Sequence, residues 1–268
     1  MGEHGENSIF HYSDINAVAA IISSSKLWLT NAFFLNDSRE IMEGIDTISS
    51  ALDEHILTLK DSPELVRGAR FLQGGFMYAR TAAESQGIYT CSFSKSGDLL
   101  SQWQAYGFFA IEFDERLLDV QPDLKTVALP VLSPCMYAED KKLSIAKIAV
   151  QQYCAELNDI LINENPEGGI EQIKELMVLA ACFKNRHFEA EQEVRLIRHS
   201  VGPKIRFRAK DDHLVPYLEH EFAPSAIKAV HIGPVKNPVL AAESLRILLQ
   251  SNGMSGVDIV KSQIPFRS

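Results

Sequence analysis

The segments of this chain that are typical of β-strands gather near its two ends, and long helical segments lie between them. Near the N-terminus, Ser8–Ser13 is predicted to be a strand, Asp14–Ser24 an amphipathic helix and Lys26–Thr30 a second strand. Because strands and helices do not alternate regularly along the chain, a doubly wound parallel sheet is disfavoured. We expect an α+β fold instead.

Helical segments at about 39–86 and 139–186 are expected to flank a strand-rich core within a single domain, 1–268. The first contains two amphipathic helices, Arg39–Thr58 and Pro63–Glu84, and the second is broken near its middle by Asn-Pro and Gly-Gly pairs. Further strands are predicted at Gly87–Ser94, Gly107–Phe113, Leu129–Tyr137, Gln192–Ile197, Lys204–Phe207, Ala226–Ile232 and Val257–Val260. One further helix is predicted at Pro238–Ser251.

The charge balance limits the partners that the whole surface can bind. The chain carries 26 Lys and Arg against 35 Asp and Glu, a formal net charge of −9, so broad coating of DNA or RNA is not expected. The N-terminus lacks the regions of a secretory signal, and no stretch approaches the roughly 20 apolar residues that span a bilayer. With four cysteines and no C-x-x-C pair, the sequence favours a cytoplasmic protein without a membrane partner.

Several common catalytic signatures are missing from the sequence. It contains no G-x-G-x-x-G, no G-x-x-x-x-G-K-[ST], no G-x-S-x-G and no H-E-x-x-H. Rossmann dehydrogenases, P-loop phosphotransferases, α/β-hydrolases and zincins are therefore disfavoured.

The most informative segment is Phe188–Ile197, where acidic and apolar residues alternate. If the segment is a strand, its apolar residues point to one face of the sheet. Its charged residues then point to the other face, and these are Glu189, Glu191, Glu193 and Arg195. Such a polar face is ordinarily solvated. Three close carboxylates also repel one another, so a site could use this face to raise the pKa of one carboxyl or to bind a cationic ligand.

Two further groups of candidates lie in the first 40 residues. His11 lies between two aromatic residues on the first predicted strand, two positions before Ser13, where a histidine can belong to the core or can point into a cleft. Asn36 belongs to a turn with Asp37 and Ser38 that also suits a helix cap.

Later candidates are aromatic or basic. Trp103 and Tyr106 have helical spacing, which fits core residues or a stacking surface for a planar ring. A basic segment alternates along a predicted strand and fits a solvated face or contact with a phosphate-bearing ligand; its residues are Lys204, Arg206, Arg208 and Lys210. His213 and His220 are expected at the surface.

Taken together, these segments resemble an uncharacterised bacterial domain family of small cytoplasmic proteins. The matching motifs span nearly the whole chain. They are Phe10-His11-Tyr12-Ser13, Leu27-Trp28-Leu29-Thr30, Phe34-Leu35-Asn36-Asp37-Ser38-Arg39-Glu40, Cys91-Ser92-Phe93-Ser94, Trp103 with Tyr106-Gly107 and Glu112-Phe113, Glu191-Gln192-Glu193-Val194-Arg195, Ile232-Gly233-Pro234 and the C-terminal Ser262-Gln263-Ile264-Pro265-Phe266-Arg267. The chain departs from the family at Ser38, where proline is commoner, and at Phe188, where tryptophan is.

A more distant resemblance is to the ADP-ribosyltransferases, which place His-x-[ST] on a first strand and Glu-x-Glu on a late strand. It implies a mixed or antiparallel split sheet with flanking helices and a helical insertion, and NAD as substrate without a metal. Carried over, Glu193 is the catalytic carboxylate and Glu191 its accessory. The implied ligand-binding residues are His11, Ser13, Asn36, Ser92, Ser94, Trp103, Tyr106 and Arg195.

Three functions are therefore expected as alternatives. The first is an NAD-consuming ADP-ribosyltransferase or glycohydrolase, with a role as toxin or defence effector and an unidentified acceptor macromolecule. The second is a nuclease or phosphodiesterase that holds Mg²⁺ through Asp37, Glu191 and Glu193. The third is a non-enzymatic binding module, in which the acidic segment is ordinary surface and the aromatic residues belong to the core.

Overall fold

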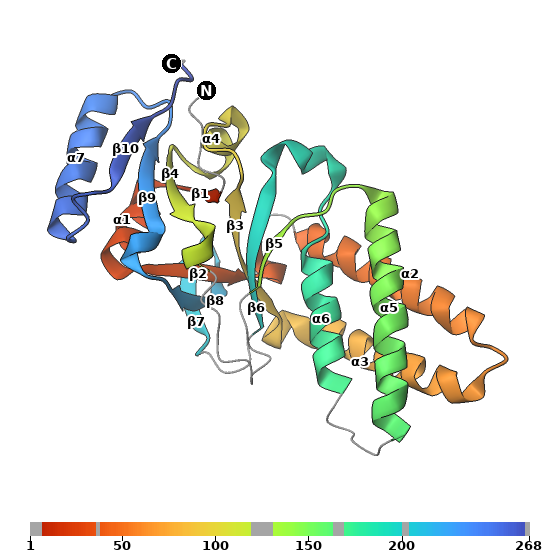
Figure 1. The fold of residues 1–268 in the computed structure, drawn as a ribbon. Coiled ribbons are helices and arrows are strands. Elements are labelled where there is room, and N and C mark those ends of the chain that lie inside the picture. The colour runs from red at the N-terminus through yellow and green to blue at the C-terminus, as the bar shows by residue number, and fades with distance from the viewer. Residues whose placement is uncertain (1–6, 36–37, 119–130, 163–168, 200–203, 266–268) are drawn as a thin grey trace.

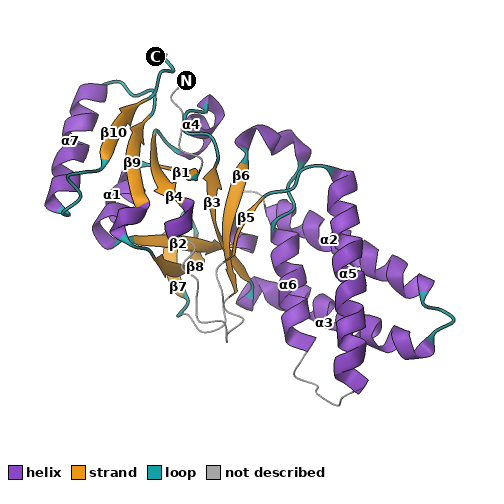
Figure 2. Cartoon of the chain, in the orientation of Figure 1, coloured by secondary structure: helices purple, strands orange, loops and turns teal. Residues whose placement is uncertain are grey.

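The computed structural model describes residues 7–35, 38–118, 131–162, 169–199 and 204–265, which form an α+β fold (Figure 1, Figure 2). A ten-stranded, mostly antiparallel sheet occupies one side of the molecule, and a layer of long helices lies beside it. The α+β class expected from the sequence is confirmed.

The chain begins with β1 (Ser8–Ser13), α1 (Ile15–Ser24) and β2 (Lys26–Asn31), as the sequence predicts. The Asp14 carboxylate caps α1 by accepting two backbone N–H groups of the first turn, at 2.8 and 2.9 Å. Ser25 ends the helix in a left-handed conformation, with φ 52°, and turns the chain into β2. Local contacts thus set both ends of α1.

The remaining strands complete the sheet. They are β3 (Ile88–Ser94), β4 (Phe109–Asp114), β5 (Val131–Pro134), β6 (Glu193–His199), β7 (Arg206–Lys210), β8 (His213–Glu221), β9 (Ile227–Ile232) and β10 (Asp258–Lys261). Their order is β10-β9-β4-β1-β3-β2-β8-β7, with β6 paired to β3 and β5 paired to β6. Among the described strands β9 and β10 run parallel, and the other pairs are antiparallel.

The sheet branches at β3. Along one edge, β3 pairs with β6 from Ile88 to Ser94. Along the other edge it meets β1 at Phe10, opposite Ser94, and it meets β2 at Thr30 and Asn31. Because β1 and β2 pair with opposite ends of β3, the sheet divides into two wings, β10-β9-β4-β1 and β2-β8-β7, which share β3.

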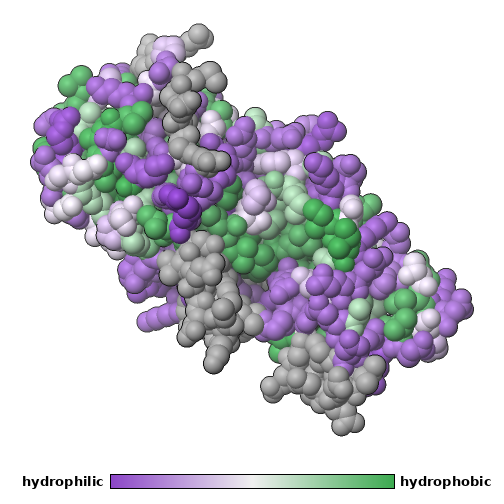
Figure 3. Space-filling view, viewed as in Figure 1, coloured by the Kyte–Doolittle hydropathy of each residue, from purple (hydrophilic) through white to green (hydrophobic). Residues whose placement is uncertain are grey.

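A layer of helices packs beside β3, β5 and β6 (Figure 1). It consists of α2 (Ser38–Thr58), α3 (Pro63–Gln86), α5 (Glu139–Ile162) and α6 (Ile170–Ala181). Their buried side chains form one hydrophobic cluster that includes Ile45, Phe76, Val150 and Leu176. On the face shown in Figure 3, hydrophilic side chains cover much of this layer, and hydrophobic ones gather toward the middle of the molecule. No helix in the described ranges is long and apolar enough to cross a membrane.

The two faces of the sheet carry different residues because side chains alternate along each strand. One face packs against α1 and α7 (Pro238–Ser251) and includes Phe93 and Val194 in its hydrophobic cluster. The opposite face includes Phe10, which belongs to a smaller cluster under α4 (Leu100–Tyr106). This division decides which candidate residues can meet.

The strand predicted at Gln192–Ile197 is confirmed as β6, but the extension of that strand back to Phe188, which would place three glutamates on one face, is wrong. Residues Arg186–Glu191 form a 3-10 helix, η4, and β6 starts only at Glu193. The Asn185 side chain starts η4 by accepting a backbone N–H, and Gln192 ends it in a left-handed conformation with φ 45°. Glu189 and Glu191 therefore do not share a strand face with Glu193, and the predicted row of three carboxylates does not form.

The region after β6 also differs from the sequence prediction. The basic strand is β7, Arg206–Lys210, rather than Lys204–Phe207, and it pairs with β8, a strand that the pattern did not indicate. His220 on β8 is buried rather than exposed, and its Nε2 donates to the Leu118 carbonyl at 3.2 Å. His213, at the start of β8, is exposed as expected.

We expect Gly44→Ala to lower the free energy of unfolding by about 1–3 kcal/mol, as overpacking does. A Cβ at Gly44 in α2 would collide with the Ala180 carbonyl of α6, which is backbone and cannot rotate away. The matched control is Gly74→Ala in α3, where a Cβ meets no atom, and which should stabilise the chain by about 0.5–1 kcal/mol. Urea unfolding of both variants measures the difference, and equal effects would contradict the α2–α6 packing.

Candidate functional site

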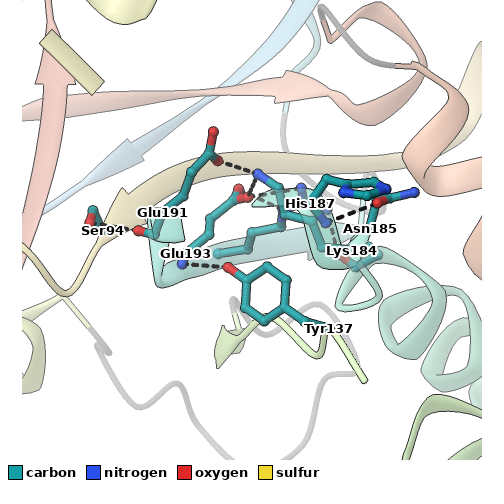
Figure 4. Close-up of polar contacts among 9 residues, drawn as sticks. Ser94, Tyr137, Lys184, Asn185, His187, Glu191 and Glu193 are labelled. Carbon is teal, nitrogen blue, oxygen red and sulfur yellow. Dashed lines mark hydrogen bonds and ion pairs between the residues drawn. The ribbon is translucent and has the colours of Figure 1, made fainter. Parts of the chain in front are cut away.

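Glu193 lies at the centre of a buried ion network (Figure 4). Its side chain is 4% exposed. Arg195 donates to one carboxylate oxygen from Nε at 2.7 Å and to the other from Nη2 at 3.1 Å, and Lys184 donates to that second oxygen. Both oxygens of Glu193 therefore bind cations inside the protein.

Lys184 extends this network to a second carboxylate. Its ammonium donates to Glu191 at 2.5 Å as well as to Glu193, and it lies 5.1 Å from the centre of the Phe188 ring. Glu191 is the more accessible of the two acids, with 16% of its side chain exposed. One ammonium group thus holds together the Glu-x-Glu pair that the sequence singled out, as Figure 4 shows.

Three elements, β3, β6 and α6, position the network together with Tyr137, which lies between β5 and α5. Ser94 on β3 lies directly opposite Glu193 on β6, and its hydroxyl donates to the Glu191 carbonyl at 2.7 Å. Arg195 also donates to the carbonyl of Ala181, the last residue of α6, at 2.8 Å. The Glu193 backbone N–H donates to the Tyr137 hydroxyl at 2.8 Å. The network therefore ties the sheet to the helical layer.

The electrostatics keep Glu193 ionised. Burial alone would raise the pKa of Glu193, but the charges and hydrogen bonds of Arg195 and Lys184 outweigh burial and lower the pKa to about 2. Burial raises the pKa of the Tyr137 hydroxyl to about 12, so this group is neutral near pH 7. A neutral Tyr137 can accept the Glu193 N–H and still donate its own proton to another group.

A cavity of about 430 Å³ lies beside the network, within the size range of small-molecule sites. Its lining residues are Tyr137, Ala138, Glu139, Asp140, Arg186 and Glu189. Tyr137 belongs both to this wall and to the network. Helix η4 contributes Arg186 and Glu189 to the cavity wall. The last residue of η4 is Glu191, which belongs to the ion network.

His11 lies on the other face of the sheet from Glu193. Its Nδ1–H donates to the Ser92 carbonyl at 2.9 Å, and its ring packs against Phe93 at 5.6 Å. Phe93 is on the opposite face from Ser94 and Glu193 because side chains alternate along β3. Burial lowers the pKa of His11, and the hydrogen bond to Ser92 only partly offsets this.

The two aromatic candidates, Trp103 and Tyr106, have different surroundings, because one is buried and the other exposed. Trp103 is 1% exposed, packs against Tyr12 at 4.5 Å and donates from Nε1 to Asp98, so it is a core residue. Tyr106 is 44% exposed at the end of α4. A Cβ on the next residue, Gly107, would meet the Ser13 carbonyl, so the end of α4 lies against Ser13 at the end of β1.

The structure thus brings together Ser94, Glu191, Glu193 and Arg195, and it does not bring His11 to them. Asn36 and Asp37 lie outside the described residues. Sequence reasoning missed Lys184 and Tyr137, because nothing in their local pattern marks them and their partners come from other elements. In the described ranges no group of three His, Cys, Asp or Glu residues could hold a metal ion.

A second buried carboxylate, Glu112 on β4, was also missed. It accepts hydrogen bonds from Ser8 at 2.6 Å and from Nε2 of His231 at 2.9 Å, and Lys228 donates to Ser8 at 2.6 Å. Burial alone would raise its pKa, but these partners lower the pKa to about 2. The carboxylate separates the serine from the histidine, so this cluster is not arranged as a serine nucleophile with a histidine base.

We expect Glu193→Gln to lower the free energy of unfolding by about 3–5 kcal/mol, because Arg195 and Lys184 would lose a counter-ion inside the protein. The exposed ion pair of Glu54 with Lys147 provides the control, and Glu54→Gln should cost less than about 1 kcal/mol. Urea unfolding at pH 7 measures both, and a small loss for Glu193→Gln would rule out a structural role for the network.

The same network should make stability depend on acid pH. Because the pKa of Glu193 falls from 4.5 to about 2 on folding, its contribution is fully present above about pH 4.5 and is lost as the pH drops toward 2. The wild type should therefore lose stability more steeply over this range than Glu193→Gln does, as measured by urea unfolding at each pH. Parallel curves would contradict the lowered pKa of Glu193.

Comparisons with known proteins leave the function to be argued from this geometry. No protein-family model, no curated protein and no solved structure matches the chain. Any assignment of function therefore rests on the residues and contacts of the chain itself.

Proposed function

We propose that the protein consumes NAD, as an ADP-ribosyltransferase or an NAD glycohydrolase, at the carboxylate pair Glu191 and Glu193. The observation that carries this proposal is that the Lys184 ammonium binds both carboxylates, beside Ser94. The resemblance to ADP-ribosyltransferases assigns the late Glu-x-Glu pair to catalysis and includes Ser94 among the implied ligand-binding residues. The branching of the sheet at β3 supports a split sheet of that type.

Within the proposal, Glu191 acts on the substrate and Glu193 positions Lys184, which reverses the roles expected from the sequence. Two cations already neutralise Glu193, so it can offer little charge to a substrate. Glu191 has a single cationic partner among the described ion pairs and is more exposed. It also lies on η4, which forms part of the cavity wall.

The chemistry requires a carboxylate near the ribose. The C1′–N glycosidic bond of NAD breaks, nicotinamide leaves with the bonding electron pair, and positive charge develops on the ribosyl carbon. A carboxylate that is already in place stabilises this charge. Water or an acceptor nucleophile then bonds to C1′ and releases its proton to solvent. Glu191 would supply the stabilising charge, and Lys184 would fix its position.

The other residues implied by the resemblance have no assigned role in this proposal. His11 lies on the opposite face of the sheet, Arg195 is engaged with Glu193 and Ala181, and Trp103 is a core residue. A macromolecular acceptor, and a role as toxin or defence effector, remain expectations from the resemblance.

A non-enzymatic binding module is the second candidate, because both oxygens of Glu193 already bind protein cations. In that case Lys184, Glu193 and Arg195 only join the sheet to the helices, and the cavity binds a ligand without turnover. The magnesium-dependent alternative has less support, since a cation at Glu191 and Glu193 would have to displace Lys184.

We expect the purified chain to release nicotinamide from NAD, and Glu191→Gln to slow this release by about 100-fold or more, as the loss of a transition-state charge does. The variant should keep its fold because Lys184 retains Glu193 as a partner. Nicotinamide is measured by chromatography, with and without a cell lysate as a source of acceptors, and the melting temperature is measured in parallel.

Glu243→Gln serves as the control for this assay. Glu243 forms an exposed ion pair with Arg246 on α7, and its replacement should leave nicotinamide release unchanged. If the wild type releases no nicotinamide with or without lysate, the NAD proposal is wrong and the binding module is favoured. Equal release by the wild type and Glu191→Gln would remove Glu191 from the mechanism.

A further inference from the structure

Two aromatic rings stack on an exposed part of the sheet, in the wing β2-β8-β7. Trp28 on β2 packs against Tyr217 on β8, with ring centroids 4.4 Å apart and ring planes 29° from parallel. Leu27 and Leu29, on either side of Trp28, are buried in the cluster with α1 and α7, so Trp28 points to the opposite face of the sheet. Tyr217 is 7% exposed, whereas Trp28 is 43% exposed. Tyr217 thus holds the Trp28 ring in place while much of that ring stays accessible.

Basic side chains of β7 lie on the same face, beside the two rings. Arg206 on β7 lies directly opposite Tyr217 on β8, so their side chains project to one face. Arg208 and Lys210 follow at alternate positions and therefore project to that face as well. The Arg208 guanidinium donates to the hydroxyl of Thr30 on β2, at 3.2 Å, so the β7 cations and Trp28 lie on one continuous surface.

The carboxylates of this face are already bound by cations. They belong to Glu219 and Glu221 on β8: Lys26 lies 3.1 Å from the first and 3.0 Å from the second, and Arg206 lies 3.2 Å from the first. Arg208 is exposed and forms no ion pair with a described residue. Two more acids lie in the turn that follows β7, beyond the end of the basic row, and these are Asp211 and Asp212. The Arg208 charge is therefore available to an anionic ligand.

We propose that this face binds single-stranded nucleic acid, with a base stacked on Trp28 and the phosphates along β7. Aromatic rings on an exposed sheet stack unpaired bases, and arginine guanidinium groups suit phosphate. Cations that recur about 7 Å apart along a strand can contact successive phosphates of one extended chain. A duplex keeps its bases within the stack, so it cannot use Trp28 in this way. The face shares no residue with the proposed NAD chemistry and does not depend on it.

Binding of the full chain to a fluorescein-labelled oligothymidylate tests the proposal, with anisotropy measured at low ionic strength. The chain has two tryptophans, and Trp103 is 1% exposed, so quenching of tryptophan fluorescence reports stacking on Trp28. The wild type should bind and be quenched. Trp28→Leu, which keeps an apolar side chain against Tyr217, should bind about tenfold more weakly or worse, as the loss of one stacked base predicts.

Arg208→Gln adds an electrostatic measurement that a merely structural role would not change. The logarithm of the affinity falls linearly with the logarithm of the salt concentration, and the loss of one phosphate contact should make this slope shallower by about 0.7. The matched control is Arg246→Gln, at an exposed ion pair on α7, which should bind with the affinity and the slope of the wild type.

Three results would overturn the proposal. The first is no binding of oligothymidylate by the wild type, and the second is equal binding by the wild type and Trp28→Leu. The third is tighter binding of duplex DNA or of inorganic polyphosphate than of oligothymidylate, which would leave a basic surface without a stacking site. An unchanged salt slope in Arg208→Gln would remove the phosphates from β7 and contradict the proposed binding mode.

Discussion

The attraction between the Glu193 carboxylate and the cations Arg195 and Lys184 is the constraint on which the rest of the molecule depends. Glu193 and Arg195 lie on β6, which pairs with the branch strand β3, and Lys184 follows the last turn of α6. Arg195 also reaches the end of α6 through the Ala181 carbonyl. Because each charge would be costly to bury alone, the network fixes where the helical layer meets the sheet.

The same network decides how the carboxylates can be used. A carboxylate bound by two buried cations stays ionised, but it has little charge left to offer a substrate, so Glu193 is suited to holding Lys184 in place. Glu191 shares that ammonium, is more exposed and belongs to the short helix that borders the cavity. A site built in this way depends on the fold, because its parts come from β3, β6, η4 and the segment after α6.

Much of the fold could be predicted from the sequence, because local signals specify it. The Asp14 cap and the apolar spacing that follows it define α1, and Pro63 begins α3. The prediction was wrong at Glu189 and Glu191, where polar and apolar residues alternate as in a strand but the chain forms a 3-10 helix. The alternation does not reveal that Asn185 caps this helix or that Gln192 ends it in a left-handed conformation. The network partners could not be predicted either, because Lys184 and Tyr137 reach Glu193 only through tertiary packing.

A double-mutant cycle on Lys184 and Glu193 tests most directly whether their attraction joins the two parts of the molecule. The free energy of unfolding is measured for the wild type, Lys184→Met, Glu193→Gln and the double variant at pH 7. If the account is right, the double variant is more stable than the sum of the single losses predicts, with a coupling energy of about 1–3 kcal/mol. Single losses that add within about 0.5 kcal/mol would contradict it.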